Sequence, residues 1–423
     1  MGSLKGVNIQ RGAIGPAVNG DKDAIMGLLA NGPAVAASAG VVGIALGQTV
    51  KLTSVDDAKA YGIDEAYDSA NHVRVYRHIS EFFRICGEGN LYLMLYSGTP
   101  SDAFGDTYGK KMIADANGDI RALAVAYSPA ADYVPTNVNG IDDNVYAAIA
   151  AGQVFYDWTY STFRPCQVVL EGRGYAAATS ASALDLRNIT VGGAVLKAFK
   201  VSVCIGQDWD YAETQNAVGK NFADVGTMLG SLALRPVSHN IAEVEGGDIS
   251  SAKKGIWVTA GLSNHHKITE DESYLETLDT KGYIFAISYA GLSGYYWNND
   301  HTCTPVIQDA DGYFNEYTIS YGRPHDKAVR ELRTALLPHV KSTQPVDPST
   351  GKLPAAIVGY FEAIGDGVFA RMAQAGDITK GKTKIDPNSN LLIMPRELKG
   401  SFVIVPQGQV DEIKGAINLK TNI

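Results

Sequence analysis

The sequence predicts an α/β (α+β) protein with mixed sheets flanked by helices, several domains, and a β arm at each end. Two observations predict this class. Short apolar segments rich in β-branched residues alternate with helical intervals along the chain, which is typical of a mainly parallel sheet covered by helices. Both ends of the chain carry stretches in which apolar and polar residues alternate strictly, which is typical of exposed strands.

The predicted strands are short apolar segments bounded by glycine or polar residues, as in a sheet covered on both faces. An alternating segment with Tyr313, Asn315, Tyr317, Ile319 and Tyr321 on one face is predicted to be a further strand. The other strand predictions are residues 41–46, 50–53, 91–96, 122–127, 167–170, 200–205, 255–259, 283–289, 391–394 and 401–405.

The predicted helices follow from apolar residues that recur every three or four positions. Ser54 and Asp57 form a capping box that begins the first helix. The last helix keeps its apolar period across Gly365 and Gly367, so these glycines are expected to allow another element to approach closely. The predicted helices are residues 54–61, 71–86, 145–151, 181–186, 216–234, 324–340 and 355–375, and residues 380–390 are expected to form a loop.

Composition limits the function classes. The net charge of −9 and the pI near 5.4 leave no basic face for phosphate contacts, so nucleic acid is not expected as a partner. No apolar run approaches the roughly 20 residues that span a bilayer, so no membrane association is expected. The four cysteines, Cys86, Cys166, Cys204 and Cys303, are widely separated and are expected to be reduced.

The two chain ends have the pattern of β arms. Val7 and Ile9 share one face near the N-terminus, and Ile413, Ile417, Leu419 and Ile423 share one face at the C-terminus. A chain end frays unless something pairs with it. The arms either complete a sheet of their own domain or add to sheets of neighbouring copies, and the residues alone leave both possibilities open.

Signatures of catalysis and metal binding are weak. Gly172, Gly174 and Ala177 follow a strand as G-x-G-x-x-A, so a nucleotide-binding α/β enzyme that uses this loop is the alternative function. However, the acidic residue expected about 20 positions later is missing. Two further groups fit solvated loops better than metal sites, namely His265, His266, Glu270 and Asp271, and Asp115, Asn117, Gly118 and Asp119. No catalytic residue, metal or cofactor is therefore predicted.

The order of the elements resembles the tail sheath proteins of contractile phages and related contractile injection systems. The matching motifs near the N-terminus are a strand ending at Leu52, a helix capped by Thr53 and Ser54 that ends at Tyr61 and Gly62, and a helix that closes on paired aromatics and glycines. In the C-terminal half they are the strand at 283–289, a Gly-containing loop, a Tyr-rich segment, two helices, and an arm introduced by Pro406.

The resemblance implies a structural subunit that polymerises helically around an inner tube and contracts, rather than an enzyme. It implies an arm at residues 1–20, outer α/β domains at 21–275, an inner core domain at 276–405 and an arm at 406–423. The implied partners are other copies of the chain, an inner tail tube protein, and baseplate and terminator proteins. Assembly is expected in the cytoplasm of the producing bacterial cell, and the mature protein belongs to a virion tail or contractile particle.

The resemblance also places the tube-facing surface on one of the last two helices. The residues expected to face the tube are Glu362, Asp366 and Arg371. A third possibility, a surface or baseplate-type adhesion module, predicts a small closed oligomer in place of an open polymer.

Overall fold

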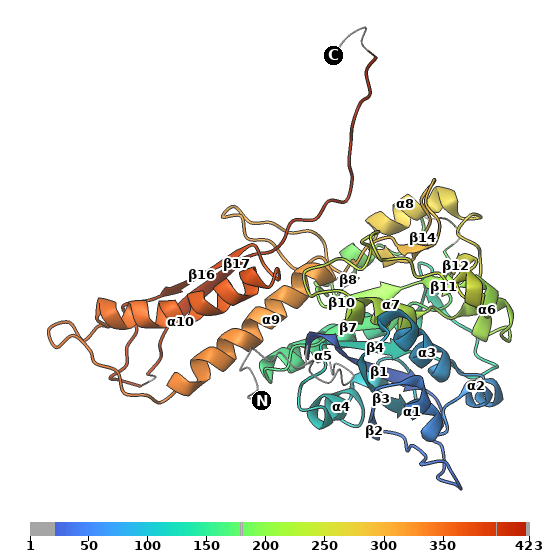
Figure 1. The fold of residues 1–423 in the computed structure, drawn as a ribbon, viewed down its shortest axis with the longest axis horizontal. Coiled ribbons are helices and arrows are strands. Elements are labelled where there is room, and N and C mark those ends of the chain that lie inside the picture. Colours follow the sequence, from blue (N-terminus) through green and yellow to red (C-terminus); the bar gives the residue numbers. More distant parts are fainter. Residues whose placement is uncertain (1–21, 178, 180, 395, 420–423) are drawn as a thin grey trace, which may run out of the picture.

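The computed structural model describes residues 22–419 except 178, 180 and 395, and is centred on a seven-stranded sheet (Figure 1). The strand order is β13-β10-β7-β4-β1-β3-β2, and all neighbours are parallel except β2 and β3. The predicted mixed α/β fold is therefore confirmed. The strands are β1 (Ile25–Asn31), β2 (Thr49–Leu52), β3 (Asn90–Tyr96), β4 (Ala122–Ala126), β7 (Gln167–Glu171), β10 (Val201–Cys204) and β13 (Tyr283–Ile284).

Helices cover both faces of this sheet. The helices α3 (Val75–Cys86) and α7 (Val225–Leu234) pack together on one face, and α5 (Asp143–Ser161) packs on the other (Figure 1). The contact between α3 and α7 is close because a Cβ atom at Gly226 would overlap the backbone of His78. The smaller helices are α1 (Val55–Ala60), α2 (Glu65–Asn71), α4 (Gly109–Asp115), α6 (Trp209–Glu213) and α8 (Glu272–Thr280).

Four small antiparallel sheets surround the large sheet and its helices, which together form the body of the protein. They pair β5 (Asn137–Val138) with β6 (Ile141–Asp142), β8 (Thr190–Val191) with β9 (Ala194–Val195), β11 (Gly206–Asp208) with β12 (Ala260–Leu262), and β14 (Ala286–Ile287) with β15 (Tyr296–Trp297).

The chain ends in a C-terminal section that extends to one side of the body (Figure 1). It consists of α9 (Ile319–Leu336), α10 (Ala355–Gln374) and a hairpin of β16 (Lys380–Ile385) and β17 (Gly400–Val405). It has small apolar clusters of its own, in which Leu332 on α9 meets Phe369 and Met372 on α10. Residues Leu278 and Trp297 belong instead to the large cluster of the body. The domain boundaries suggested by the resemblance stay a prediction.

Two strand predictions in the second half of the chain are wrong. The segment at 283–289 is not one strand, because Phe285 lies between β13 in the large sheet and β14 in a separate hairpin. The alternating tyrosines at 313–321 do not form a strand either. Phe314, Tyr317 and Tyr321 form an aromatic cluster, with ring centroids 5.3–6.3 Å apart. Helix α9 already begins at Ile319 and contains Pro324.

Other elements also differ from the prediction. Residues 41–46 make only isolated bridges, and residues 255–259 and 391–394 are turns, bends or isolated bridges. Residues 181–186 form turns and irregular structure up to a short 3-10 helix that begins at Leu186. The central strand β1 and the outer strand β16 were not predicted. The helix expected at 216–234 is shorter, since α7 begins at Val225. The predicted arm residues Val7, Ile9 and Ile423 lie outside the described residues.

Candidate assembly surface

The C-terminal hairpin is held against α10 by one of the two glycines in that helix. A Cβ atom at Gly365 would overlap the side chain of Thr383 on β16, whereas a Cβ atom at Gly367 would meet nothing within 4 Å. The expected close approach is therefore confirmed for Gly365 and wrong for Gly367. Phe369 takes up the equivalent space beside Gly381, so β16 lies directly on the helix.

The outer edge of β16 is closed by carboxylates of α10. Asp366 Oδ1 accepts a hydrogen bond from the backbone N–H of Thr383 over 2.7 Å, and Glu362 Oε1 accepts one from Ile385 over 3.0 Å. Lys382 also contacts Asp366. Burial would raise the pKa of Asp366, but the bond from Lys382 and the Thr383 N–H outweigh it, and the pKa lies below its ordinary value. Two of the N–H groups on this edge, those of Thr383 and Ile385, are therefore already paired.

The edge of β17 is open. Within the described residues, β17 pairs only with β16, so its second edge has no neighbouring strand. Its side chains are also accessible, since Phe402 is 40% exposed and Val405 is 54% exposed. An exposed apolar edge strand is a template for pairing with another chain. The hairpin therefore offers one acceptor edge, on β17.

Four side-chain hydrogen bonds fix the first residues of the C-terminal arm, where it leaves the hairpin. Gln407 Nε2 donates to the carbonyl of Ile378 over 3.1 Å, and Thr379 Oγ1 donates to the carbonyl of Pro406 over 2.8 Å. Gln409 is held by two further bonds, from its Nε2 to Ser320 Oγ (2.5 Å) and from Asn240 Nδ2 to its Oε1 (3.3 Å). The first two bonds tie the start of the arm to the residues just before β16. Gln409 then holds the arm beside α9 and the body, and from there it extends away from the hairpin (Figure 1).

Beyond Gln409 the described part of the arm has no secondary structure, and its apolar side chains are exposed to solvent. Val410 is 77% exposed, Ile413 is 89% exposed, and Ile417 and Leu419 are each 99% exposed. Three of the four C-terminal arm residues singled out in the sequence thus extend into solvent. Isoleucine and leucine side chains of this exposure are unfavourable in water unless another surface covers them.

The three residues expected to face a tube do not form one patch. Glu362 and Asp366 turn toward β16 and are partly buried by it. Arg371 is exposed on another side of α10, where its Nη1 donates to the carbonyl of Gly367 over 3.2 Å. A tube contact through these residues stays a prediction.

Helix α9 is fixed to the body by buried polar groups at its N-terminal half. Asp300 Oδ2 accepts a bond from the backbone N–H of Ser320 over 2.7 Å, and burial raises the pKa of Asp300 to about 7. Lys200 directly precedes β10 and is fully buried. Its Nζ lies 3.0 Å from Asp326 and 2.9 Å from Glu316. Burial lowers the pKa of Lys200, but these two carboxylates outweigh it and raise it. These buried contacts join α9 to the body.

The glycine loop of the alternative hypothesis has the wrong local structure for a phosphate site. Among the described residues between β7 and Leu186, the chain forms turns and bends and no helix, so the loop does not lead into a helix as a phosphate-binding fingerprint does. Gly172 is packed against Val203 and the carbonyl of Cys204, and this carbonyl accepts the Gly172 N–H over 2.7 Å. The sequence match therefore marks a strand-to-loop turn.

The adjacent histidines point to different partners. His265 Nε2 lies 2.6 Å from Glu213 and its ring stacks on Trp209, whereas His266 Nδ1 lies 3.4 Å from Asp271. No group of three or more metal-ligating side chains occurs in the described parts of the chain. Nor does any helix of those parts combine the length and hydrophobicity of a bilayer span.

Two features of the assembly surface were missed in the sequence. Lys380, Lys382 and Lys384 alternate with small or apolar residues, and this period could have revealed β16. The anchoring of Gln409 has no sequence signal, because Asn240 and Ser320 are far away in the chain.

Comparisons with known proteins agree with this architecture. The fold matches a subunit of the helical sheath of the anti-feeding prophage (AFP) in the contracted state, determined by cryo-EM, with a TM-score of 0.56 and 15% sequence identity over 99% of both chains. At this identity the match shows the fold, and it confirms at that level the resemblance to contractile sheath proteins. No curated protein matches the sequence. Residues 8–301 match the family described as DUF2586, N-terminal domain, and the chain belongs to this family.

Proposed function

We propose that this protein is the structural subunit of a contractile sheath, which polymerises helically around an inner tube by exchanging β arms between copies. The observation that carries the proposal is the combination of a bare apolar arm and an open strand edge in one molecule. The arm exposes Ile413, Ile417 and Leu419, and β17 lacks a second neighbour among the described residues.

The arm of one copy adds to the hairpin of another. Its own hairpin is not the acceptor, because Gln409 holds the arm beside Ser320 and Asn240, beyond the end of β17. The acceptor edge is that of β17, since Asp366 and Glu362 occupy the edge N–H groups of β16. A donor and an acceptor at different places on the same chain make a heterologous contact, which repeats without closing and builds a helix.

Such a lattice can shorten without coming apart. Backbone hydrogen bonds between an arm and its acceptor strand persist while the bodies rotate about the arm. The work of contraction is the free-energy difference between two packings of the same subunits, set when the sheath assembles, so a nucleotide is not required. The likeness to a sheath solved in its contracted state supports a fold compatible with the compact packing.

A sheath subunit also has other partners. An inner tail tube protein lies within the sheath, and baseplate and terminator proteins are located at its two ends. Helix α10 is the proposed tube-facing helix. Of the three residues expected to face a tube, Glu362 and Asp366 are engaged by β16 and Arg371 lines the junction with the body, so the exposed Tyr360 is the proposed contact residue. Assembly takes place in the producing bacterial cell, before the protein becomes part of a tail or contractile particle.

Electron microscopy of the purified protein tests the proposal. Wild-type protein should form long hollow tubules, and deletion of residues 415–423 should abolish them while circular dichroism stays nearly unchanged. The paired variant Ile413→Asp/Ile417→Asp should behave like the deletion. Its control, Lys414→Gln/Asn418→Asp, changes the net charge equally on the opposite face of the arm and should still form tubules. Monomers or closed rings at high wild-type concentration would disprove the proposal.

A further inference from the structure

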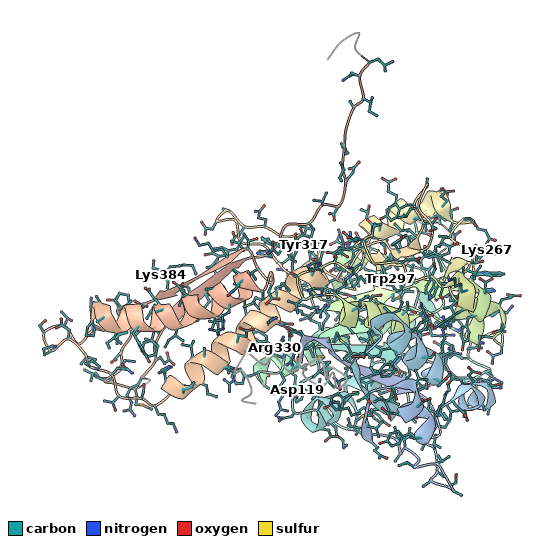
Figure 2. All side chains as sticks on the ribbon, in the orientation of Figure 1. Asp119, Lys267, Trp297, Tyr317, Arg330 and Lys384 are labelled. Carbon is teal, nitrogen blue, oxygen red and sulfur yellow. The ribbon has the colours of Figure 1, made fainter. Side chains whose placement is uncertain are left out.

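A basic cleft lies where the C-terminal section joins the body. It has a volume of about 870 Å³ and is bounded by the segments that lead into β1 and β4, by the end of α5, and by α9 and α10. Figure 2 labels Arg330 on α9 and Asp119 in the segment before β4, on the two sides of this junction. The cleft is defined here by Arg121, Lys327, Arg330, Arg333 and Arg371.

Positive charge is in excess in this cleft. Its lining contains five basic side chains and only two carboxylates, Asp23 and Glu331. Asp23 contacts Lys327 (2.8 Å) and Arg330 (2.9 Å), and lies 3.8 Å from Nε of Arg121. Two carboxylates at the edge of the cleft also contact these cations, since Asp377 lies 2.8 Å from Lys327 and Asp119 lies 3.9 Å from Arg121. Arg333 and Arg371 make no ion pair among the described residues, so the positive charge of the cleft is concentrated on them.

Two of these arginines have guanidinium groups whose hydrogen-bonding capacity is not fully used within the described residues. Arg333 makes no ion pair within the described residues, and its guanidinium lies over the ring of Phe163 at 3.5 Å from the centroid. Arg121 is about nine-tenths buried and its Nη1 donates to the carbonyl of Gly118 over 2.7 Å, but its Nε has no hydrogen-bond partner among those residues. Burial, followed by the charge of Arg330, lowers the pKa of Arg121 to about 10. The neighbouring charge of Arg330 is the part of this shift that a bound anion would offset.

The rim of the cleft is apolar, which a small inorganic anion does not need. Phe163 is 52% exposed and Leu337 is 52% exposed. Phe163 also has a φ of 63°, a left-handed conformation that is costly for an aromatic residue and holds the ring beneath Arg333. A cation-aromatic pair beside an apolar rim suits a protein surface that brings carboxylates together with apolar groups.

The charge distribution of the chain identifies that surface. Residues 1–318 contain 22 lysines and arginines against 35 aspartates and glutamates, whereas residues 319–423 contain 14 against 10. The body is therefore acidic and the C-terminal section is basic. In a heterologous contact between copies, such patches attract each other and fix the orientation of approach.

We propose that the basic cleft binds carboxylates on the acidic α/β body of a second copy of this chain. This contact is separate from the arms and does not require that the polymer be a sheath. It adds a salt-dependent side-by-side interaction to the strand exchange. Exposed charge pairs of this kind weaken at high ionic strength, whereas backbone pairing of the arms does not.

Sedimentation of the full-length protein at low and high salt tests the proposal. The variant Arg333→Glu/Thr334→Glu changes two exposed cleft residues, and Lys341→Glu/Thr343→Glu makes the same change in net charge on the exposed loop that follows α9. We expect the cleft variant to weaken self-association at low salt by about tenfold or more. The control should associate like the wild type, and the difference should shrink in high salt.

Other outcomes separate this proposal from the sheath function. Closed rings that still require Arg333 would support the cleft and contradict the sheath. Tubules that form equally well with the cleft variant would overturn the cleft proposal alone. It would also be overturned if inorganic phosphate raised the melting temperature of wild type but not of the cleft variant, while both associated equally, because the cleft would then be a small-anion site.

Discussion

Asp366 on α10 accepts the backbone N–H of Thr383 on β16 over 2.7 Å, so a helix carboxylate occupies a position where a neighbouring strand would otherwise bind. Glu362 does the same for Ile385. The hairpin therefore differs from a free two-stranded sheet, which would expose two edges for pairing. With one edge closed, a second chain can add in register only beside β17.

Removing the two carboxylate charges should loosen the hairpin and open this edge. In Asp366→Asn/Glu362→Gln, the charge-assisted bonds to two backbone N–H groups and the contact with Lys382 are weakened. We expect the free energy of unfolding to fall by about 1–3 kcal/mol, measured by urea denaturation. Glu397→Gln, at an exposed carboxylate of the same section, is the control. An unchanged urea midpoint would show that the carboxylates do not hold β16.

The two glycines of α10 should respond oppositely to alanine. Gly365→Ala places a methyl group against Thr383, and overpacking of this kind costs about 1–3 kcal/mol. Gly367→Ala meets nothing within 4 Å and should stabilise the helix by up to about 1 kcal/mol, because alanine restricts the unfolded chain. Thermal unfolding of both variants measures the difference. Equal losses would contradict the assignment of Gly365 as the contact position.

Local patterns predicted most of the fold. The helix at 355–375 is observed at Ala355–Gln374, because one stripe of it is apolar over its whole length. The strand at 401–405 is β17, and the parallel order of the large sheet follows from the alternation of strands and helices. The strand predicted at 313–321 is wrong because aromatic residues that alternate with polar ones can also cluster in a turn.

The candidate sites depend on register and on distant contacts, which the sequence does not reveal. Asp366 reads as a solvated helix charge until β16 is placed beside it. The basic cleft joins residues as far apart as Asp23 and Arg371. The alternation of apolar and polar residues did indicate the exposed apolar side chains of the C-terminal arm, whereas its pairing with another copy stays a prediction.

The ion pair between Lys200 and Asp326 should be essential to the joint between α9 and the body. Both residues are buried, and Tyr156 also donates to Asp326 over 2.8 Å. Lys200→Met removes the buried ammonium group from Asp326 and Glu316. His325 stays 2.9 Å from Glu316 and 3.7 Å from Asp326, so the loss should be about 3 kcal/mol, at the lower end for a broken buried pair. The double variant Lys200→Met/Asp326→Leu should recover part of this loss. Chemical denaturation of the wild type, Lys200→Met, Asp326→Leu and the double variant gives the coupling energy. Additive losses of stability would exclude a coupled pair.

Asp300 should make the stability of the protein fall as the pH rises from about 4 to 7. Its carboxyl group is fully buried, and one oxygen, Oδ1, has no hydrogen-bond partner within the described residues. Burial raises its pKa from the ordinary 3.8 to about 7, although Ser320 and the charge of Arg323 oppose the shift. The folded protein thus keeps a proton that the unfolded chain has released. This contribution is complete below pH 4 and is lost as the pH rises through 7.

Asp300→Asn cannot ionise and therefore isolates this effect. Relative to wild type, the variant should gain stability with rising pH, by about 4 kcal/mol over the whole interval. Urea denaturation at half-unit pH steps measures the difference curve, in which the contributions of the other carboxylates cancel. Asp311→Asn, at an exposed position in the next loop, should give a flat difference curve. A flat curve for Asp300→Asn as well would mean that Asp300 titrates normally and caps α9 as an ordinary carboxylate.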